Sequence, residues 1–264
     1  MNGERGGDLG GDLGDSRVLV VGGSSGIGRA TGIAAAKAGA RVAFAGRRTE
    51  LLEEAAAEAG PDALALTCDV READQCAEVV ARTVDRFGGL DHLVLAVGMT
   101  YLCDVVDTTA AQWHDLAATN LIGPALVTTA AIPHLTDVRG KVVFISSAAV
   151  IGPWPGLVAY AAVKSGLETL ARGLQDEHPT VGFSTVAISS TTTDVLQGID
   201  RATLKARFSQ WRERGFVSRG EMSPHALAEH LVGLLASPLR LPFVLAVPPP
   251  RPSAGPEAPR SGTG

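Results

Sequence analysis

The sequence predicts an α/β fold, a single-domain doubly wound parallel sheet with helices on both faces. Short apolar runs of strand type alternate with helical runs along nearly the whole chain, which is the pattern of repeated strand–helix–strand units. Aromatic residues make up only 5% of the 264 residues, and small and aliphatic residues dominate, which suits helices packed closely on a buried sheet. A hydrophobic content of 45% is sufficient for one large core.

The first half of the chain alternates regularly. Gly39 stands where a left-handed residue ends the first helix, and Thr49 stands where a side chain would cap the second. In chain order, we expect a strand at Arg17–Val21, a helix at Ile27–Ala38, a strand at Arg41–Ala45, a helix at Thr49–Ala59, a strand at Ala63–Thr67, a helix at Glu72–Phe87 and a strand at His92–Ala96.

The second half continues the alternation with longer helices. Pro124 and Pro133 complicate the regularity of the first of these helices, and the second is strongly amphipathic. In chain order, we expect a helix at Ala110–Leu135, a strand at Lys141–Ser146, a helix at Val158–Glu177, a strand at Phe183–Ile188, a mixed polar segment at Thr191–Gly215, a helix at Pro224–Ala236 and a strand at Pro242–Val247.

The composition limits the classes of partner. We expect a flexible glycine-rich leader at 1–15, a folded domain at 16–248 and a disordered proline-rich tail at 249–264. The net charge of −5 does not support a nucleic-acid surface, and we find no apolar run of the length that spans a membrane. The three cysteines form no metal-ligand pattern and are interpreted as reduced thiols, so we expect a cytoplasmic protein without a metal site.

A glycine-rich turn follows the first strand and opens the first helix. Glycines there let the backbone approach a pyrophosphate, and the helix N-terminus supplies unpaired N–H groups. The residues expected to bind a dinucleotide at this turn are Gly22, Ser24, Ser25, Gly26, Ile27 and Gly28. The sequence Gly22-x-Ser24-x-Gly26 also fits the nucleophile elbow of a hydrolase. That alternative would require an acid and a histidine, such as His178 or His225, downstream.

The end of the second strand indicates which dinucleotide binds. NAD-binding sheets usually place a carboxylate there for the ribose hydroxyls, whereas this chain has Gly46 followed by Arg47 and Arg48. Because guanidinium groups pair well with a 2′-phosphate, we expect NADP(H) as the cofactor. Asp69, after the third strand, is placed to accept a hydrogen bond from the adenine amino group.

One tyrosine has a spacing that suits proton transfer. Tyr160 lies four residues before Lys164, so both side chains share one face of the expected helix. An ammonium at roughly 4 Å, with an effective dielectric of about 20, stabilises a phenolate by about 4 kcal/mol before desolvation is counted. We therefore expect Lys164 to lower the pKa of Tyr160, which would let the phenol exchange protons with an alcohol or ketone.

Five short motifs together resemble the short-chain dehydrogenase/reductase family, whose domain is Rossmann-like. They are GGSSGIG at 22–28, CDV at 68–70, TNLIG at 119–123, ISS at 145–147 and YAAVK at 160–164. The resemblance implies that Tyr160 is the general acid or base, that Lys164 lowers the pKa of Tyr160 and binds the nicotinamide ribose, and that Ser147 orients the substrate oxygen. It further implies that Asn120 holds a water linking Lys164 to solvent.

The resemblance also implies cofactor contacts at the ends of later strands. Besides the residues already named, these contacts are expected at Val70, Ala96, Val97, Gly98, Ile188 and Thr192. Two segments depart from the family pattern. Leu95-Ala96-Val97-Gly98 replaces an Asn-Asn-Ala-Gly-like segment, and serines and threonines at 189–193 replace a Pro-Gly pair, so Thr192 and Thr193 are both candidates for the nicotinamide contact.

The expected substrate is a small-molecule ketone or secondary alcohol with a mainly hydrophobic body. The candidate pocket segments, after the fourth and fifth strands and in Val195–Trp211, are largely apolar. The last segment is expected to act as a lid whose basic side chains favour either solvent or an acidic acyl-carrier protein. The resemblance implies a homodimer or homotetramer. An enzyme that uses the tyrosine for a non-redox step and a non-catalytic NADP-sensing protein remain alternatives.

Overall fold

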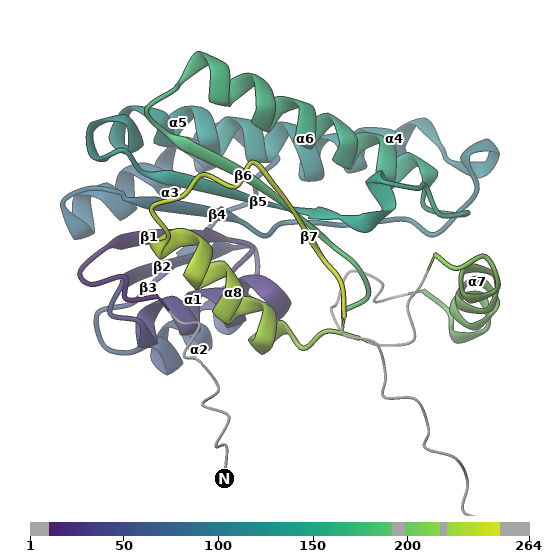
Figure 1. The fold of residues 1–264 in the computed structure, drawn as a ribbon, viewed down its shortest axis with the longest axis horizontal. Helices are drawn as coiled ribbons and strands as arrows, with labels where there is room; N and C mark the ends of the chain where they lie inside the picture. The colour runs from purple at the N-terminus through teal and green to yellow at the C-terminus, as the bar shows by residue number, and fades with distance from the viewer. Residues whose placement is uncertain (1–10, 192–198, 217–220, 249–264) are drawn as a thin grey trace, which may run out of the picture.

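The computed structural model describes residues 11–191, 199–216 and 221–248 and contains one parallel seven-stranded sheet. Its strand order is β3-β2-β1-β4-β5-β6-β7, so the chain starts in the middle, winds outward to β3 and returns through β4 to the other edge (Figure 1). The strands are β1 Arg17–Val21, β2 Arg41–Gly46, β3 Leu64–Thr67, β4 His92–Leu95, β5 Lys141–Ser147, β6 Gly182–Ile188 and β7 Phe243–Ala246. The predicted doubly wound fold is confirmed.

Helices cover both faces of the sheet (Figure 1). One face carries α1 (Gly26–Lys37), α2 (Thr49–Ala59) and α8 (Pro224–Ala236). The opposite face carries α3 (Ala73–Phe87), α4 (Ala110–Ala117), α5 (Gly123–Val138) and α6 (Val158–Glu177). The remaining helix, α7 (Arg201–Glu213), lies beyond the end of the sheet.

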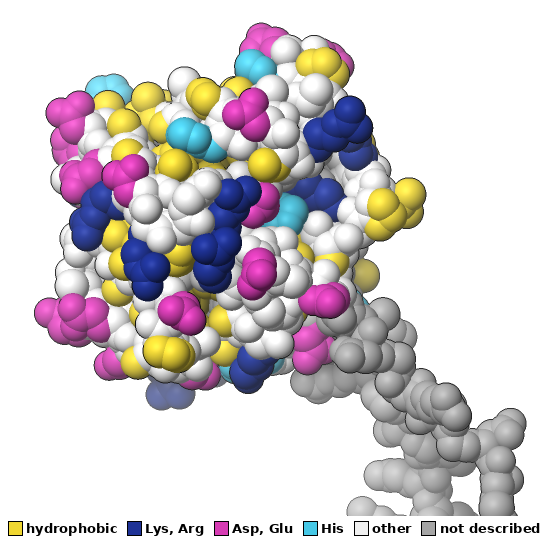
Figure 2. All heavy atoms as spheres, turned by 90° about the vertical axis from the view of Figure 1, so that its left-hand side faces the viewer, with side chains coloured by type: hydrophobic (Ala, Val, Ile, Leu, Met, Phe, Trp, Pro, Cys, Tyr) yellow, Lys and Arg dark blue, Asp and Glu magenta, His cyan; other side chains and the backbone are white. Residues whose placement is uncertain are grey.

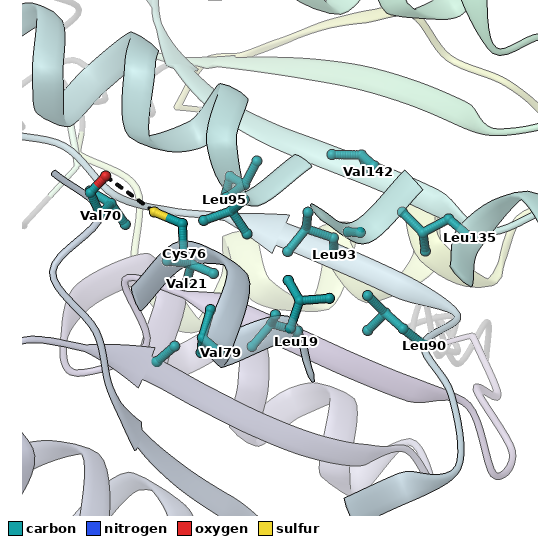
Figure 3. Packing of buried hydrophobic residues seen from close by; sticks show 14 of the residues in the cluster. Leu19, Val21, Val70, Cys76, Val79, Leu90, Leu93, Leu95, Leu135 and Val142 are labelled. Carbon is teal, nitrogen blue, oxygen red and sulfur yellow. Dashed lines mark hydrogen bonds between the residues drawn. The ribbon is translucent and has the colours of Figure 1, made fainter. Parts of the chain in front are cut away.

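Two apolar cores result from the alternation of side chains along the buried strands. In β5, Val142 and Phe144 pack on the side of α3, α5 and α6, whereas Val143 and Ile145 pack on the side of α1 and α8. Figure 3 shows the first core, where leucines and valines from β1 and β4 meet side chains of α3 and α5. The face turned away from α7 mixes basic and acidic side chains (Figure 2).

The observed elements correct several sequence expectations. Thr49 is the first residue of α2 rather than its N-cap, which is Arg48, and no side-chain cap bond forms there. The predicted leader does not extend to Leu13, which is 5% exposed and whose N–H bonds the carbonyl of Ala38 at 2.9 Å. The polar segment contains α7, capped by the Asp200 carboxylate, which accepts from two backbone N–H groups.

The long helix expected at Ala110–Leu135 is three segments in the structure. A π-helical turn, Ala118–Ile122, separates α4 from α5. Over Ala110–Val138, mean hydropathy and length alone would permit a membrane crossing. The buried residues of α5, such as Val127 and Leu135, pack in the core of the sheet, which accounts for part of that apolar character.

Candidate functional site

The carboxyl ends of the strands open onto a cavity of about 640 Å³. Most of the residues expected to bind the cofactor line it: Gly22, Ser24, Ser25, Gly26, Ile27, Arg47, Arg48, Asp69, Val70, Ala96, Val97, Gly98 and Ile188. Three of the four expected catalytic residues, Ser147, Tyr160 and Lys164, line the same cavity. Gly28 and Asn120 support it from behind, as described below, and Thr192 lies outside the described residues.

The glycine-rich turn is packed too tightly for side chains. Gly22 has φ +87°, and a Cβ there would lie 2.6 Å from the carbonyl carbon of Ala96. A Cβ on Gly28 would overlap the carbonyl of Gly22. These contacts bring the start of α1 close to the ends of β1 and β4, so that the helix N-terminus faces the cavity. The shape and the exposed N–H groups fit the pyrophosphate of a dinucleotide.

Arg48 joins the turn to the end of β2. Its Nη2 donates to the hydroxyls of Ser24 at 2.9 Å and Ser25 at 2.6 Å, and its Nε lies 3.2 Å from the Ser24 hydroxyl. Ser24 is therefore bonded to a guanidinium rather than to an imidazole. No histidine lines the cavity within the described residues, so the hydrolase alternative has no base.

Asp69 is engaged differently from the expectation. Its carboxylate accepts from Arg71, with Nη2–Oδ2 at 2.6 Å and Nε–Oδ1 at 3.0 Å, and this side-chain bond lowers the pKa of Asp69. The backbone N–H of Asp69 donates to Gln75 at 2.8 Å. An adenine amino group would therefore share this carboxylate with Arg71, a partner that the spacing did not indicate.

Tyr160 and Ser147 meet at the far end of the cavity from the arginines. Tyr160 packs with Leu116, Ala159 and Val163, and this burial raises the pKa of its phenol to about 12, while the hydrogen bond with Ser147 lowers it. The direction is opposite to the sequence expectation. The phenol is consequently protonated at neutral pH.

Lys164 is held by backbone rather than by the tyrosine. The side chain is 2% exposed, and Nζ donates to the carbonyls of Ile145 at 3.0 Å and Val97 at 3.3 Å. Burial lowers the pKa of Lys164 to about 8. The ammonium therefore bridges the ends of β4 and β5 beneath the cavity.

Asn120 lies in the π-helical turn and is fully buried. Its Nδ2 donates to the carbonyls of Met99 and Leu116, both at 3.0 Å, and its Oδ1 accepts from the N–H of Met99 at 3.1 Å. The amide thus braces the loop after β4. Pro124 has no N–H to offer the carbonyl of Asn120 four residues earlier, so this carbonyl is released from the regular helical ladder.

Aromatic side chains of Trp154, Phe208 and Trp211 line one side of the cavity. Trp211 is 1% exposed, and its Nε1 donates to the carbonyl of Pro155 at 2.8 Å. Its ring centroid lies 5.2 Å from that of Trp154 and 5.1 Å from that of Phe208. Sequence reasoning placed this segment over the pocket, but it missed the indole anchor, for which the periodicity of α7 gives no signal.

Within the described residues, no three His, Cys, Asp or Glu side chains come together in a group that could hold a metal ion.

Comparison with known proteins matches residues 16–203 to the family model described as short chain dehydrogenase. The chain belongs to the short-chain dehydrogenase family. Among its relatives, 11-beta-hydroxysteroid dehydrogenase A of Sesamum indicum is 33% identical over 195 residues, covering 71% of this chain and 56% of that protein. 11-beta-hydroxysteroid dehydrogenase-like 2 of Arabidopsis thaliana is 36% identical, with 57% and 50% covered. The chain spans about half the length of these curated relatives.

Two solved structures have the same fold. A dehydrogenase/reductase from Sinorhizobium meliloti superposes with a TM-score of 0.78 at 28% identity, covering 90% of this chain and 95% of that one. An alcohol dehydrogenase from Thermococcus sibiricus, complexed with 5-hydroxy-NADP, superposes with a TM-score of 0.77 at 23% identity, covering 88% and 95%.

Proposed function

We propose that this short-chain dehydrogenase is an NADP(H)-dependent oxidoreductase that interconverts a ketone and a secondary alcohol on a mainly hydrophobic substrate. The observation that carries the proposal is the cluster of Tyr160, Ser147 and Lys164 at one end of a cavity whose other end is a glycine-rich turn and an arginine. A dinucleotide lying along the cavity would present its nicotinamide to the tyrosine, and that ring supplies the hydride.

The chain's own residues then have separate tasks. The Ser147 hydroxyl orients the carbonyl oxygen, and Tyr160 donates its phenolic proton to that oxygen as the alcohol forms. A pKa of about 12 keeps this proton in place at neutral pH, which is the state that carbonyl reduction requires. The buried Lys164 ammonium, four residues after the tyrosine on α6, stabilises the phenolate that remains.

The preference for NADP(H) over NAD(H) rests on Arg48. Its guanidinium is fixed by Ser24 and Ser25 at the cavity edge, beside Arg47, where a 2′-phosphate would form charge-assisted bonds. We expect Arg48→Ala to weaken NADPH binding by about 10- to 100-fold and to leave NADH binding unchanged. Fluorescence titration of both cofactors checks this, with the exposed Arg82→Ala as the control. Equal weakening for NADPH and NADH would contradict the preference.

Turnover is tested with a panel of aryl, alicyclic and long-chain ketones, followed by loss of NADPH absorbance. We expect oxidation of NADPH with hydrophobic ketones, and a loss of about 100-fold or more in Tyr160→Phe with NADPH binding retained. The exposed Thr169→Ala, on the same helix, is the control. NADPH binding without oxidation by any ketone would instead favour a non-redox reaction or an NADP-sensing role.

A further inference from the structure

A carboxylate lies on the same helical stripe as the tyrosine and lysine of the site. Tyr160, Lys164 and Glu168 follow one another at intervals of four residues on α6, so their side chains share one face of that helix. Glu168 is partly buried, and its Oε1 accepts a hydrogen bond of 2.8 Å from the hydroxyl of Ser146. Neither residue is used in the reaction proposed above.

Ser146 occupies a position where the sheet would ordinarily bury an apolar side chain. The alternation along β5 directs Val142, Phe144 and then residue 146 towards α6. Ser146 is only 4% exposed, so its hydroxyl requires a partner within the protein. Glu168 supplies that partner through its carboxyl oxygen Oε1.

The end of β5 depends on such a bond because the neighbouring strand β4 ends before β5 does. β4 pairs with β5 only as far as Leu95, opposite Phe144. Beyond that point, residues 145–147 pair with β6 alone, and their other edge faces the cavity. The orientation of Ser147 therefore depends on bonds that connect this strand end to α6.

Three consecutive residues of β5 make those bonds. The carbonyl of Ile145 accepts from Lys164, the hydroxyl of Ser146 donates to Glu168, and the hydroxyl of Ser147 lies close enough to the Tyr160 phenol to lower its pKa. Of these three, the bond between Ser146 and Glu168 joins β5 to α6 without involving a residue assigned to the reaction. Loss of the middle bond would leave the two outer contacts free to shift relative to each other.

We propose that Glu168, acting through Ser146, is a positioning residue that fixes the Ser147 hydroxyl and the Lys164 ammonium in register with the Tyr160 phenol. This inference rests on the proposed function for its effect on turnover. The geometric part of it, the placement of the phenol, is measurable without any substrate.

The first test measures turnover. Ser146→Ala and Glu168→Ala should each lower kcat about tenfold or more, because small displacements of reacting groups have large effects on rate. The double variant should fall no further than either single one, since both remove the same bond. Glu168→Gln keeps an acceptor oxygen and should stay within about threefold of the unmodified enzyme. The exposed Glu177→Ala, which removes the same charge from the same helix, is the control.

The second test is independent of substrate. The chain has only two tyrosines, so tyrosine labelled with ¹³C at Cζ gives two signals, and Tyr101→Phe assigns them. With NADPH absent, the Tyr160 signal should move in Ser146→Ala and Glu168→Ala and stay in place in Glu168→Gln and Glu177→Ala. If the unmodified enzyme reduces no ketone, the proposed function fails while this measurement still decides the placement.

Two results would overturn the proposal. One is an unchanged Tyr160 signal with unchanged kcat in Ser146→Ala and Glu168→Ala. The other is a loss of kcat in those variants that only follows a fall in melting temperature and NADPH affinity, because a general loosening of the fold would then explain the effect.

Discussion

Replacing Lys164 by methionine should stabilise the protein at pH 7 while it abolishes turnover. The side chain is 2% exposed, and its burial lowers the pKa of the ammonium from 10.5 to about 8. Charging this group at neutral pH therefore costs more in the folded chain than in the unfolded chain. Methionine has a similar length and carries no charge, so it removes that cost.

The magnitude follows from the two pKa values. At about 1.4 kcal/mol for each pKa unit, the difference between 10.5 and about 8 corresponds to about 3 kcal/mol at pH 7. Against this, the carbonyls of Val97 and Ile145 lose their shared donor, at about 1–2 kcal/mol together. The variant should therefore gain about 1–2 kcal/mol, or about 3–6 °C in melting temperature.

The pH dependence separates this cause from others. Because the folded pKa lies below the unfolded one, the destabilisation by Lys164 is complete below pH 8 and is relieved as the pH rises towards 10.5. By pH 10 only about 1 kcal/mol of it remains, so the advantage of Lys164→Met should vanish or reverse.

Thermal unfolding of the cofactor-free protein from pH 6 to pH 10 measures this, with the exposed Lys205→Met as the control. A variant that is less stable at pH 7, or a stability gain that does not change with pH, would refute the reasoning.

Three further substitutions test separate parts of the structure. Gly28→Ala should lower cofactor affinity by at least tenfold, because its Cβ overlaps the glycine-rich turn, as fluorescence titration would show. Trp211→Phe should cost about 1–3 kcal/mol and open α7 to limited proteolysis, since the carbonyl of Pro155 loses its donor. Asp91→Asn should cost about 1–2 kcal/mol at pH 7 by thermal unfolding, because the carboxylate forms two ionic bonds with the arginine that opens β1.

Each of these three predictions has a control variant or a result that would contradict it. Gly173→Ala, where a Cβ meets nothing within 4 Å, should bind cofactor normally and be slightly more stable. Proteolysis of Trp211→Phe at the unmodified rate would show that the indole does not anchor α7. The pKa of Asp91 is lowered in the folded chain, so its contribution should be lost as the pH falls through that pKa. An effect of Asp91→Asn that persists unchanged in acid would contradict the ionic explanation.

Elements with a strong repeating pattern were predictable to within a residue or two. The first strand and α6 have the bounds that the sequence indicates, and the glycine-rich turn, the arginines and the tyrosine meet in one cavity. These residues are brought together by the topology, because parallel strands place their carboxyl ends at one edge. Once the alternation is established, the approximate location of the site follows from it.

The π-helical turn around Asn120 was not predicted, although the sequence contains a signal for it. Pro124 removes the N–H that would bond the carbonyl of Asn120, and Gly123 lies between the turn and the proline. The apolar pattern of 110–135 continues across this break, so hydropathy alone predicts a single helix. The N–H donor that Pro124 lacks leaves one backbone carbonyl without its helical partner. Checking the backbone hydrogen bonds residue by residue would have indicated that the regular helix is interrupted there.

The pKa of Tyr160 is shifted in the direction opposite to the one that the residue spacing predicts. An interval of four residues on a helix correctly places Tyr160 and Lys164 on one face, but it does not say how deeply that face is buried. Burial depends on segments that are distant in the sequence, here Leu116 on α4 beside Tyr160 and the backbone after β4 and within β5 beside Lys164. Burial disfavours both the phenolate and the ammonium, so the pKa of the phenol rises and the pKa of the lysine falls, although the two carbonyls accept hydrogen bonds from the ammonium. The effect of one charge on another can be anticipated from a helix, whereas the larger desolvation effect exists only once the tertiary structure has formed.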